Sequence, residues 1–533
     1  MAGAASAQRG IWRDVGVDVH ARSLADAEPQ KLATMINKGS PGEYRALGVV
    51  DRRDPRLVDV MSRSLVRYGA VGKMIAAGKR PPSWLETTMQ PTLSFGKDEP
   101  KAAKLLPSGE VEPPVPRFIF NLSPINYALA VFLHGDVSHE LQERDPTHGP
   151  GFGPGRGRSG KFLDVVSGAF CGATVVPDDE PMVMSDIQKW DAFIREVLLE
   201  LTVNTLEEAV DRNLLDSPAL AARAAMMGVS RRQLLHKLVE HPSGYLVDLY
   251  GSMPSGSYYT SLINTNANNL LLMGHLIDRV SSETSYTVAG ASERVRSLAP
   301  GLMVSYGDNQ LFSAKLFKFF GLSYKPELHA EFLSRFGMKL KIDETEVTTQ
   351  LGRVRFCSRA VVSTPEGLLV TRTHTAMYQK LAARPEHDPV ADKLYVRAIM
   401  ADYMGTDPLA FEAMSQVDRQ LDVPLDIGVV TPRIKKVLGP TAKNFYGSED
   451  DQALLNVLAS LQSATIDRRA LLSLHTPHGH STRKSMALGT STTVGGTLFG
   501  GPLTPAAAWA ATQDRRAWVA YINATGQQGV FRD

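Results

Sequence analysis

Cysteine is nearly absent from this chain, which has two cysteines among its 533 residues. Cys171 and Cys357 belong to no C-x-x-C pair, so the sequence predicts no zinc module and favours a reducing, cytosolic compartment. An excess of charge is also missing, because 58 basic and 56 acidic residues leave a net charge of +2. Any surface that binds nucleic acid must therefore be a local patch.

Long apolar runs are missing as well. No stretch of about 18 uncharged apolar residues occurs, so we expect no membrane-spanning helix. The opening segment, MAGAASAQRGIWRDVG, has no apolar core of the kind that secretory signals carry. What remains is an ordinary globular composition, 43% apolar and 21% charged, in a chain long enough for more than one lobe.

Apolar periodicity predicts an α+β chain in which antiparallel strands lie between helical regions. The Gly-rich segment 148–160 is expected to be a flexible connector or a loop that touches nucleic acid, and the chain from about residue 378 is expected to be mostly helical. Strands are predicted at 116–120, 181–185, 301–305, 310–314, 339–344, 353–364 and 367–375, and helices at 191–210, 230–241 and 260–280.

Two acidic segments stand where apolar runs end. SDIQKWD places Asp186 at the end of an expected strand and Asp191 one turn further on. SYGDNQ places Asp308 and Asn309 on a tight turn between two expected strands. A D-x4-D pair often arises by chance, and Gly, Asp and Asn are common hairpin residues. Neither segment identifies a site by itself.

Two further segments carry polar residues of other kinds. PSGSYYTSLINTN places Ser255 and Gly256 in a loop, and it places Thr260 and Asn264 on one face of the following helix because they are four residues apart. A polar helix start would give the same pattern. FGKDEPKAAKLLPSGEVEPPVPRFIF gathers cations in a nearly neutral chain, as a solvated hairpin also would. Its basic residues are Lys97, Lys101, Lys104 and Arg117.

In this order, the segments resemble the motif series of viral RNA-dependent RNA polymerases, with the picornavirus and calicivirus supergroup as the nearest pattern. GKDEPK…PRFI resembles motif F, SDIQKWD motif A, SGSYYTSLIN motif B and SYGDN motif C. Downstream, FLSRFGMKLKIDETE resembles motif D and VRFCSRAVV motif E, while upstream KGSPGEY is a candidate motif G. The resemblance covers roughly residues 38–365.

Motif C departs from the usual form of this family. Most members read GDD, whereas this chain reads GDNQ. GDNQ is typical of non-segmented negative-strand viruses and also occurs in some fungal viruses, the polymycoviruses and their relatives. Because motifs A, B and F resemble those of positive-strand viruses, the fungal group is favoured.

The resemblance implies an α+β right-hand fold, with fingers, a palm built on an antiparallel sheet, and a thumb. Fingers are expected at residues 1–180 and 211–253, and the palm at 181–210 and 254–375. Residues 376–533 would form the thumb and a C-terminal loop, in which 474–505 is a candidate priming or exit-blocking loop.

The implied reaction is template-directed addition of NTPs to RNA, in which two divalent ions clamp the attacking and leaving oxygens. By resemblance, the catalytic and metal-binding residues are Asp186, Asp308 and Asn309, and the ions are Mg²⁺ or Mn²⁺. Asn309 supplies a carbonyl oxygen but no charge. We therefore expect weaker ion binding and a shift of preference toward Mn²⁺.

The resemblance also implies contacts with the nucleotide and the RNA. Asp191 and Asn264, with Ser255 or Thr260, would read the ribose 2′-hydroxyl, which is both donor and acceptor. The triphosphate would lie against Lys97, Lys101 and Arg117; the family usually has Arg at the position of Lys101. The remaining implied residues are Gly256, Ser40 and Gly42 for the template and its loop, Lys339 or Lys341 as general acid, and Arg359 for the primer grip.

Other interpretations remain open. A catalytically weakened RNA-binding protein of a viral ribonucleoprotein could keep this fold, and a reverse transcriptase would have a YxDD turn without the SGxxxTxxxN helix. His475, His478 and His480 form HTPHGH, for which a solvated loop is favoured over a metal site. The expected setting is the host cytoplasm, free or within a viral particle or ribonucleoprotein. Coat or capsid proteins are candidate partners.

Overall fold

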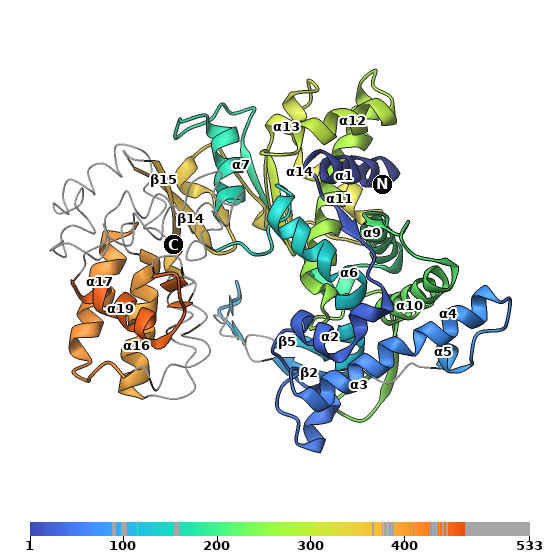
Figure 1. Cartoon of the computed structure of the whole chain (residues 1–533). Coiled ribbons are helices and arrows are strands. Elements are labelled where there is room, and N and C mark those ends of the chain that lie inside the picture. The colour runs from blue at the N-terminus through green and yellow to red at the C-terminus, as the bar shows by residue number, and fades with distance from the viewer. Residues whose placement is uncertain are drawn as a thin grey trace.

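The computed structural model describes residues 1–463 apart from gaps (Figure 1). The gaps are 88–91, 98–103, 114–115, 154–158, 365–366, 376, 378–380, 382–387, 404–405 and several positions between 427 and 445. The predictions for Lys101, for the histidines of HTPHGH and for segment 474–505 lie outside the described residues. No described helix is both long enough and apolar enough to cross a membrane.

A four-stranded antiparallel sheet with the order β10-β11-β6-β12 forms the centre of the fold. Its strands are β6 (Met182–Ser185), β10 (Met303–Tyr306), β11 (Asn309–Ser313) and β12 (Glu346–Thr348). Gln310 pairs with Ser185, so Asp186, one residue beyond the end of β6, and the β10–β11 turn lie at the same edge of the sheet. The predicted hairpin and the predicted strand 181–185 are both confirmed.

Helices cover both faces of this sheet. Side chains alternate between the two faces along each strand, so neighbouring residues of one strand pack against different helices. Val183 and Phe312 pack among apolar residues of α1 (Ala2–Asp14), α11 (Tyr259–Glu283) and α12 (Val288–Leu298). Met182, Val304 and Leu311 pack on the other face against α7 (Gly160–Phe170). Two short helices, α13 (Lys315–Lys318) and α14 (Pro326–Ser334), follow β11. The sheet is therefore buried on both sides and exposes only its edges.

A layer of helices from the N-terminal half of the chain packs around a large apolar core beside the sheet (Figure 1). Within it, the buried carboxylate of Glu207 is held by His134 at 2.8 Å and by Arg223 at 2.8 Å. The layer consists of α2 (Pro29–Met35), α3 (Pro55–Val66), α4 (Tyr68–Ala76), α5 (Trp84–Thr87), α6 (Pro124–Arg144), α8 (Trp190–Phe193), α9 (Glu196–Glu208) and α10 (Ser217–Leu235), with the 3-10 turns η1 (Leu24–Ala27) and η2 (Gly42–Leu47).

A second sheet, with the order β5-β2-β8-β9, packs beside this layer. Its strands are β2 (Thr92–Lys97), β5 (Arg117–Asn121), β8 (His236–Glu240) and β9 (Leu246–Tyr250). In the β2–β5 register Lys97 lies opposite Arg117. Two small pairs complete this part, β1 (Val19–His20) with β7 (Val210–Asp211), and β3 (Lys104–Leu105) with β4 (Val111–Glu112).

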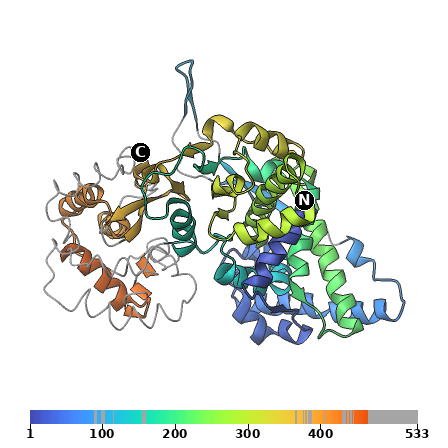
Figure 2. The same ribbon diagram turned by 90° about the horizontal axis from the view of Figure 1, so that it is seen from above.

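The C-terminal part has its own sheet and helices. The sheet contains β13 (Arg355–Phe356), β14 (Arg359–Thr364) and β15 (Gly367–Arg372). The strand predicted at 353–364 is therefore two strands joined by a turn at Cys357 and Ser358, both of which have positive φ, and the strand predicted at 367–375 ends at Arg372. A separate apolar core joins α16 (Pro389–Tyr403), α17 (Pro408–Gln420) and α19 (Asp451–Ser463). In Figures 1 and 2 these helices lie on the opposite side of the molecule from α2 to α5.

Three predicted elements outside this C-terminal sheet were also wrong in type or extent. The helix predicted at 230–241 ends at Leu235, and His236–Glu240 forms β8 because Lys237 and Val239 alternate into the core. The helix predicted at 191–210 is broken at Ile194, whose carbonyl oxygen accepts the backbone N–H of Ser252 at 2.7 Å.

The third error concerns the strand predicted at 339–344. This segment makes one bridge, between Leu340 and Ile187, and then a 3-10 turn, Ile342–Glu344. The backbone N–H of Lys341 donates to the carbonyl oxygen of Asp186 at 2.9 Å, so the segment is held against the end of β6. The strand itself, β12, begins only at Glu346.

Candidate active site

A cleft of about 710 Å³ opens where the edge of the central sheet meets β5 and the start of α11. It is lined by residues that are far apart in the sequence and come from four of the segments singled out above. Seven predicted site residues line it: Arg117, Asp191, Ser255, Thr260, Asn264, Asp308 and Asn309. The structure therefore gathers seven of the sixteen predicted site residues around one space, and Asp186 is not among the residues that line it.

Two side chains of helix α11 hold the β10–β11 turn through hydrogen bonds to Gly307. Gly307 has φ of +61°, a conformation that favours glycine. Its backbone N–H donates to Thr265 Oγ1 at 2.9 Å, and its carbonyl oxygen accepts from Asn268 Nδ2 at 3.0 Å. Because both polar groups of Gly307 are held, the position of Asp308 is set by α11 as well as by the hairpin.

Gln310, the last residue of GDNQ, is buried under the turn and carries no role in the sequence-based prediction. Its amide nitrogen donates to the Asn268 carbonyl oxygen at 3.1 Å and to Ser305 Oγ at 3.0 Å. Its amide oxygen accepts from Ser185 Oγ at 3.2 Å. Gln310 thus ties β10, β6 and α11 together directly beneath the two carboxylates. The sequence feature that could have identified Gln310 is a polar residue at a strand position whose side chain faces the core.

Asp186 is half-exposed and bound to Lys341. Lys341 Nζ lies 3.0 Å from Asp186 Oδ2 and 2.7 Å from Glu344 Oε2. The backbone N–H of Asp186 donates to Thr345 Oγ1 at 3.3 Å. Burial raises the pKa of Asp186, and the Lys341 ammonium opposes that rise. Of the two candidate general acids, Lys341 therefore reaches the site, whereas the side chain of Lys339 is exposed.

Negative charge accumulates around the turn. Asp308 keeps an exposed surface at the tip of the turn. The pKa of its carboxyl group is nevertheless raised, first because the surrounding protein displaces water from it and then by the nearby carboxylates of Asp191 and Asp186, while a backbone hydrogen bond at the turn and Arg117 oppose the rise. Carboxylates that repel one another in this way are stabilised by a bound cation.

The donor set fits a hard divalent cation. Asp186 and Asp308 offer carboxylate oxygens, and Asn309 offers an amide oxygen at the same edge. Mg²⁺ takes oxygen ligands and is often bound by one or two carboxylates plus phosphates of the substrate. Over the described residues there is no group of three or more His, Cys, Asp or Glu side chains that could hold a metal ion. The remaining ligands would therefore come from the substrate and water.

Asp191 is joined to two residues of the SGSYYTSLIN segment. Its Oδ1 accepts from Asn264 Nδ2 at 2.7 Å, and its Oδ2 accepts from the hydroxyl of Ser255. Asn264 Oδ1 is buried without a hydrogen-bond partner in the described structure. A buried, unpaired acceptor is costly, so Asn264 is poised to receive a hydrogen bond from a ligand.

The loop before α11 approaches β5 closely. Gly256 has φ of +116°, and a Cβ atom there would lie 2.3 Å from the carbonyl oxygen of Phe120. The hydroxyl of Thr260 donates to the Ser257 carbonyl oxygen at 3.0 Å and accepts the backbone N–H of Gly256 at 3.3 Å. Thr260 thus braces the loop in this structure, while Ser255 and Asn264 contact Asp191.

The remaining predicted residues differ in whether they line the cleft. Lys97 and Arg117 are exposed on paired strands, and Arg117 lines the cleft. Ser40 Oγ accepts the backbone N–H of Gly42 at 3.2 Å in the loop before η2. Arg359 is turned toward α16, where its guanidinium contacts Asp402 at 3.2 Å.

A buried polar network links helix α1 to strand β10, which leads into the β10–β11 turn. Trp12 Nε1 donates to Asp145 Oδ2 at 2.8 Å, and Asp145 Oδ1 accepts the backbone N–H of Thr147 at 2.8 Å. The Thr147 carbonyl oxygen accepts the backbone N–H of Ser305 at 3.0 Å and Asn269 Nδ2 at 3.2 Å. No motif pointed to these residues, because Trp12 lies 133 positions from Asp145 and Ser305 lies 158 positions (305 − 147) from Thr147.

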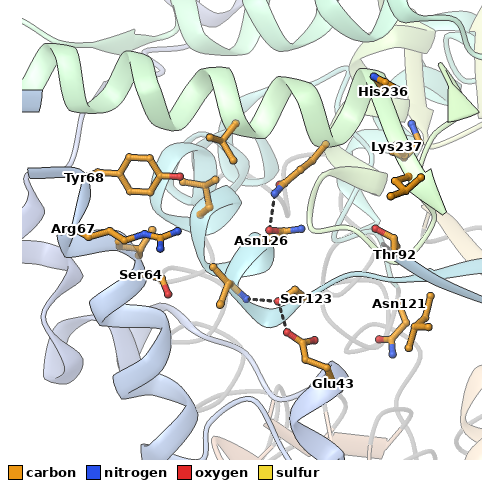
Figure 3. A pocket seen from close by; sticks show the side chains of 17 residues that line it. Glu43, Ser64, Arg67, Tyr68, Thr92, Asn121, Ser123, Asn126, His236 and Lys237 are labelled. Atoms are coloured by element: carbon orange, nitrogen blue, oxygen red, sulfur yellow. Dashed lines mark hydrogen bonds between the residues drawn. The ribbon is translucent and has the colours of Figure 1, made fainter. Parts of the chain in front are cut away.

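A smaller cavity of about 170 Å³ lies between α3, α6 and α10 (Figure 3). Its polar side chains are paired with one another, since Gln233 donates to Asn126 at 2.6 Å and Ser123 donates to Glu43 at 2.6 Å. Glu43 lies next to Gly42, so this pairing fastens the loop of Ser40 and Gly42 to the start of α6.

Residues 176–382 match the family model described as viral RNA-dependent RNA polymerase. The matched segment contains the central sheet, helix α11 and the β10–β11 turn. It therefore includes Asp186, Asp191, Asn264 and Asp308. No curated protein matches the chain in sequence. The matched domain indicates an RNA-directed RNA polymerase and implies a right-hand polymerase fold.

Proposed function

We propose that this RNA-directed RNA polymerase copies a viral RNA template by adding NTPs to the growing strand with two divalent ions, and that it both replicates and transcribes the viral genome. One observation carries the proposal. The ends of β6 and of the β10–β11 hairpin bring Asp186 and Asp308 to the same end of the central sheet, and Asp308 lines a cleft large enough for a nucleotide.

Asp186 and Asp308 are the proposed ligands of two Mg²⁺ or Mn²⁺ ions, and Asn309 adds a neutral oxygen. The ions would neutralise charge on the attacking and leaving oxygens. The pKa of both carboxyl groups is raised, first because the surrounding protein displaces water from them, and for Asp308 also by the carboxylates of Asp191 and Asp186. The clamp on Gly307 and the Gln310 network hold these groups in place, so little reorganisation is needed at reaction.

Selection of ribonucleotides is proposed to rest on the cluster of Asp191, Ser255 and Asn264. The Asp191 carboxylate and the unpaired Asn264 oxygen are both acceptors at the cleft wall. A 2′-hydroxyl can donate to the unpaired Asn264 oxygen, while the Ser255 hydroxyl keeps its hydrogen bond to Asp191. A deoxynucleotide would leave the Asn264 oxygen without a donor, which costs binding energy. Thr260 contributes by holding the loop that carries Ser255.

The charged residues around the cleft have proposed roles with phosphate and RNA. Arg117 and Lys97 would contact the triphosphate, joined by Lys101. Lys341 is the preferred general acid because its ammonium group lies at Asp186. Ser40 and Gly42 would contact the template, and Gly256 would let the loop before α11 change conformation. Arg359 would act in the primer grip by positioning the β13–β14 hairpin from its contact with Asp402.

The subdomain and family assignments are proposed in the same way. Residues 1–180 and 211–253 would be fingers, 181–210 and 254–375 palm, and 376–533 thumb with a C-terminal loop. The motifs and GDNQ favour a picornavirus- or calicivirus-like polymerase of a fungal RNA virus. It would act in the host cytoplasm, free or within a particle or ribonucleoprotein that contains viral coat or capsid proteins.

Nucleotide incorporation tests this function. Purified protein is given a short RNA template and labelled NTPs with Mg²⁺ or Mn²⁺, beside Asp308→Ala and the exposed control Asp422→Ala. Template-length product is expected from the wild type and the control and none from Asp308→Ala. If the wild type binds RNA but makes no product in either metal ion, then either the enzyme requires a partner protein or the chain is an RNA-binding protein with a weakened site.

A further inference from the structure

The ammonium group of Lys341 forms an ion pair with the carboxylate of Asp186, which is the proposed metal ligand. Lys341 Nζ lies 3.0 Å from Asp186 Oδ2, with the two side chains 30% and 43% exposed. The same nitrogen lies 2.7 Å from Glu344 Oε2, in the 3-10 turn that follows. Two carboxylates therefore share one ammonium, and only one of them, Asp186, belongs to the catalytic edge.

The segment that carries the ammonium is fixed to the strand end independently of this ion pair. The backbone N–H of Lys341 donates to the Asp186 carbonyl oxygen, and the Asp186 N–H donates to Thr345 Oγ1. Only the side chain of Lys341 has to move for the Asp186 carboxylate to be released. Glu344 can keep the ammonium during that movement, because it is already in contact with it.

A divalent ion on Asp186 and the ammonium cannot both keep their present contacts. An ion on Asp186 would lie a few ångströms from Lys341 Nζ, and two cations at such a distance repel each other strongly. Binding of the first ion must therefore displace the ammonium from Oδ2.

We propose that Lys341 is an internal counter-cation, which occupies Asp186 in the metal-free enzyme and is exchanged for a divalent ion, with Glu344 retaining the displaced ammonium. The exchange breaks the Asp186–Lys341 ion pair and forms the bond from Asp186 to the metal ion, without transfer of a proton. This inference rests on the proposed function, since it takes Asp186 to be a metal ligand. Lys341 and Glu344 are thus residues that set the metal affinity of the free enzyme.

Direct binding of Mn²⁺ tests the exchange, measured by the electron paramagnetic resonance signal of free Mn²⁺ with no RNA or NTP present. Lys341→Met is compared with Lys339→Met. This control removes one positive charge from an exposed side chain two residues earlier in the chain. Partly exposed ion pairs contribute modestly, so we expect Lys341→Met to bind Mn²⁺ about two- to five-fold more tightly than the wild type. Lys339→Met is expected to change the affinity much less.

The role of Glu344 has the opposite sign. Glu344→Gln leaves Asp186 as the main partner of the ammonium, so Mn²⁺ binding should weaken by a similar factor. Asp343→Asn removes an exposed carboxylate one position earlier and is the matched control. In the Lys341→Met background, Glu344→Gln should have no more effect than Asp343→Asn, because the shared ammonium is gone.

The results separate this inference from the proposed function. If Asp186→Asn does not weaken Mn²⁺ binding, Asp186 is not a ligand and the proposed function loses its metal site. If Asp186→Asn weakens binding but Lys341→Met and Lys339→Met behave alike, the exchange is wrong while the metal site stands. Circular dichroism and urea unfolding of each variant establish that the compared proteins are folded.

Discussion

Gln310 offers a sharp test of how the catalytic turn is held. Its side chain makes three buried hydrogen bonds, to Ser185, Ser305 and the Asn268 carbonyl oxygen. Gln310→Met keeps a similar volume but removes all three bonds and leaves two buried hydroxyl groups with fewer partners. At roughly 0.5–1.5 kcal/mol for each bond, the free energy of unfolding should fall by about 1.5–4.5 kcal/mol.

Urea unfolding followed by circular dichroism measures this loss, with Gln420→Met as the exposed control at the end of α17. The control should stay within about 0.5 kcal/mol of the wild type. Nucleotide incorporation, measured where both proteins are folded, should fall about ten- to a hundredfold for Gln310→Met because the carboxylates lose their alignment. A loss of stability no larger than that of the control would refute the clamp, and full activity would refute its role in alignment.

Three further predictions address other parts of the site and its support. Asn309→Asp should shift activity from Mn²⁺ toward Mg²⁺, because it adds a carboxylate at the metal site, and equal metal titrations for both proteins would contradict this. Gly256→Ala should abolish incorporation or lower stability by several kcal/mol, because its Cβ would lie 2.3 Å from a carbonyl oxygen at φ of +116°, whereas Gly228→Ala, in open space on α10, should be harmless. Burial raises the pKa of Glu207, but hydrogen bonds from His134 and Arg223 outweigh it and lower the pKa to about 2. A lowered pKa stabilises the fold above the unfolded value of about 4.5, so stability should fall by about 3 kcal/mol from pH 4.5 to pH 2, and Glu207→Gln should flatten this part of the urea-unfolding profile.

The elements that the sequence predicted well are those fixed by local spacing. The β10–β11 hairpin follows from a Gly-Asp-Asn turn between apolar runs, and helix α11 follows from apolar periodicity over 25 residues. The site residues on these elements meet at the cleft because the turn and the helix start lie at one end of the same layer. These parts need few long-range contacts to be recognised.

The parts that escaped prediction depend on partners distant in sequence. Lys341 contacts Asp186 across 155 positions, and this contact turns an expected strand into a 3-10 turn. Strand β8 was taken for helix because its Leu238 and Val239 continue the helical spacing of Leu234 and Leu235, and only the neighbours β2 and β9 select the strand. Asp145 has no motif, since its importance comes from Trp12 and Thr147 on either side of it.

The packing of helix α1 against elements late in the sequence affects how the chain folds during synthesis. The helix packs on α11 and α12, and its Gly3 carbonyl oxygen accepts from Ser292, which lies 289 residues later in the chain. At 5–20 residues per second, a ribosome needs roughly 15–60 s to supply that partner. During synthesis the apolar face of α1 therefore has nothing native to cover it, and the network from Trp12 to the catalytic turn closes late.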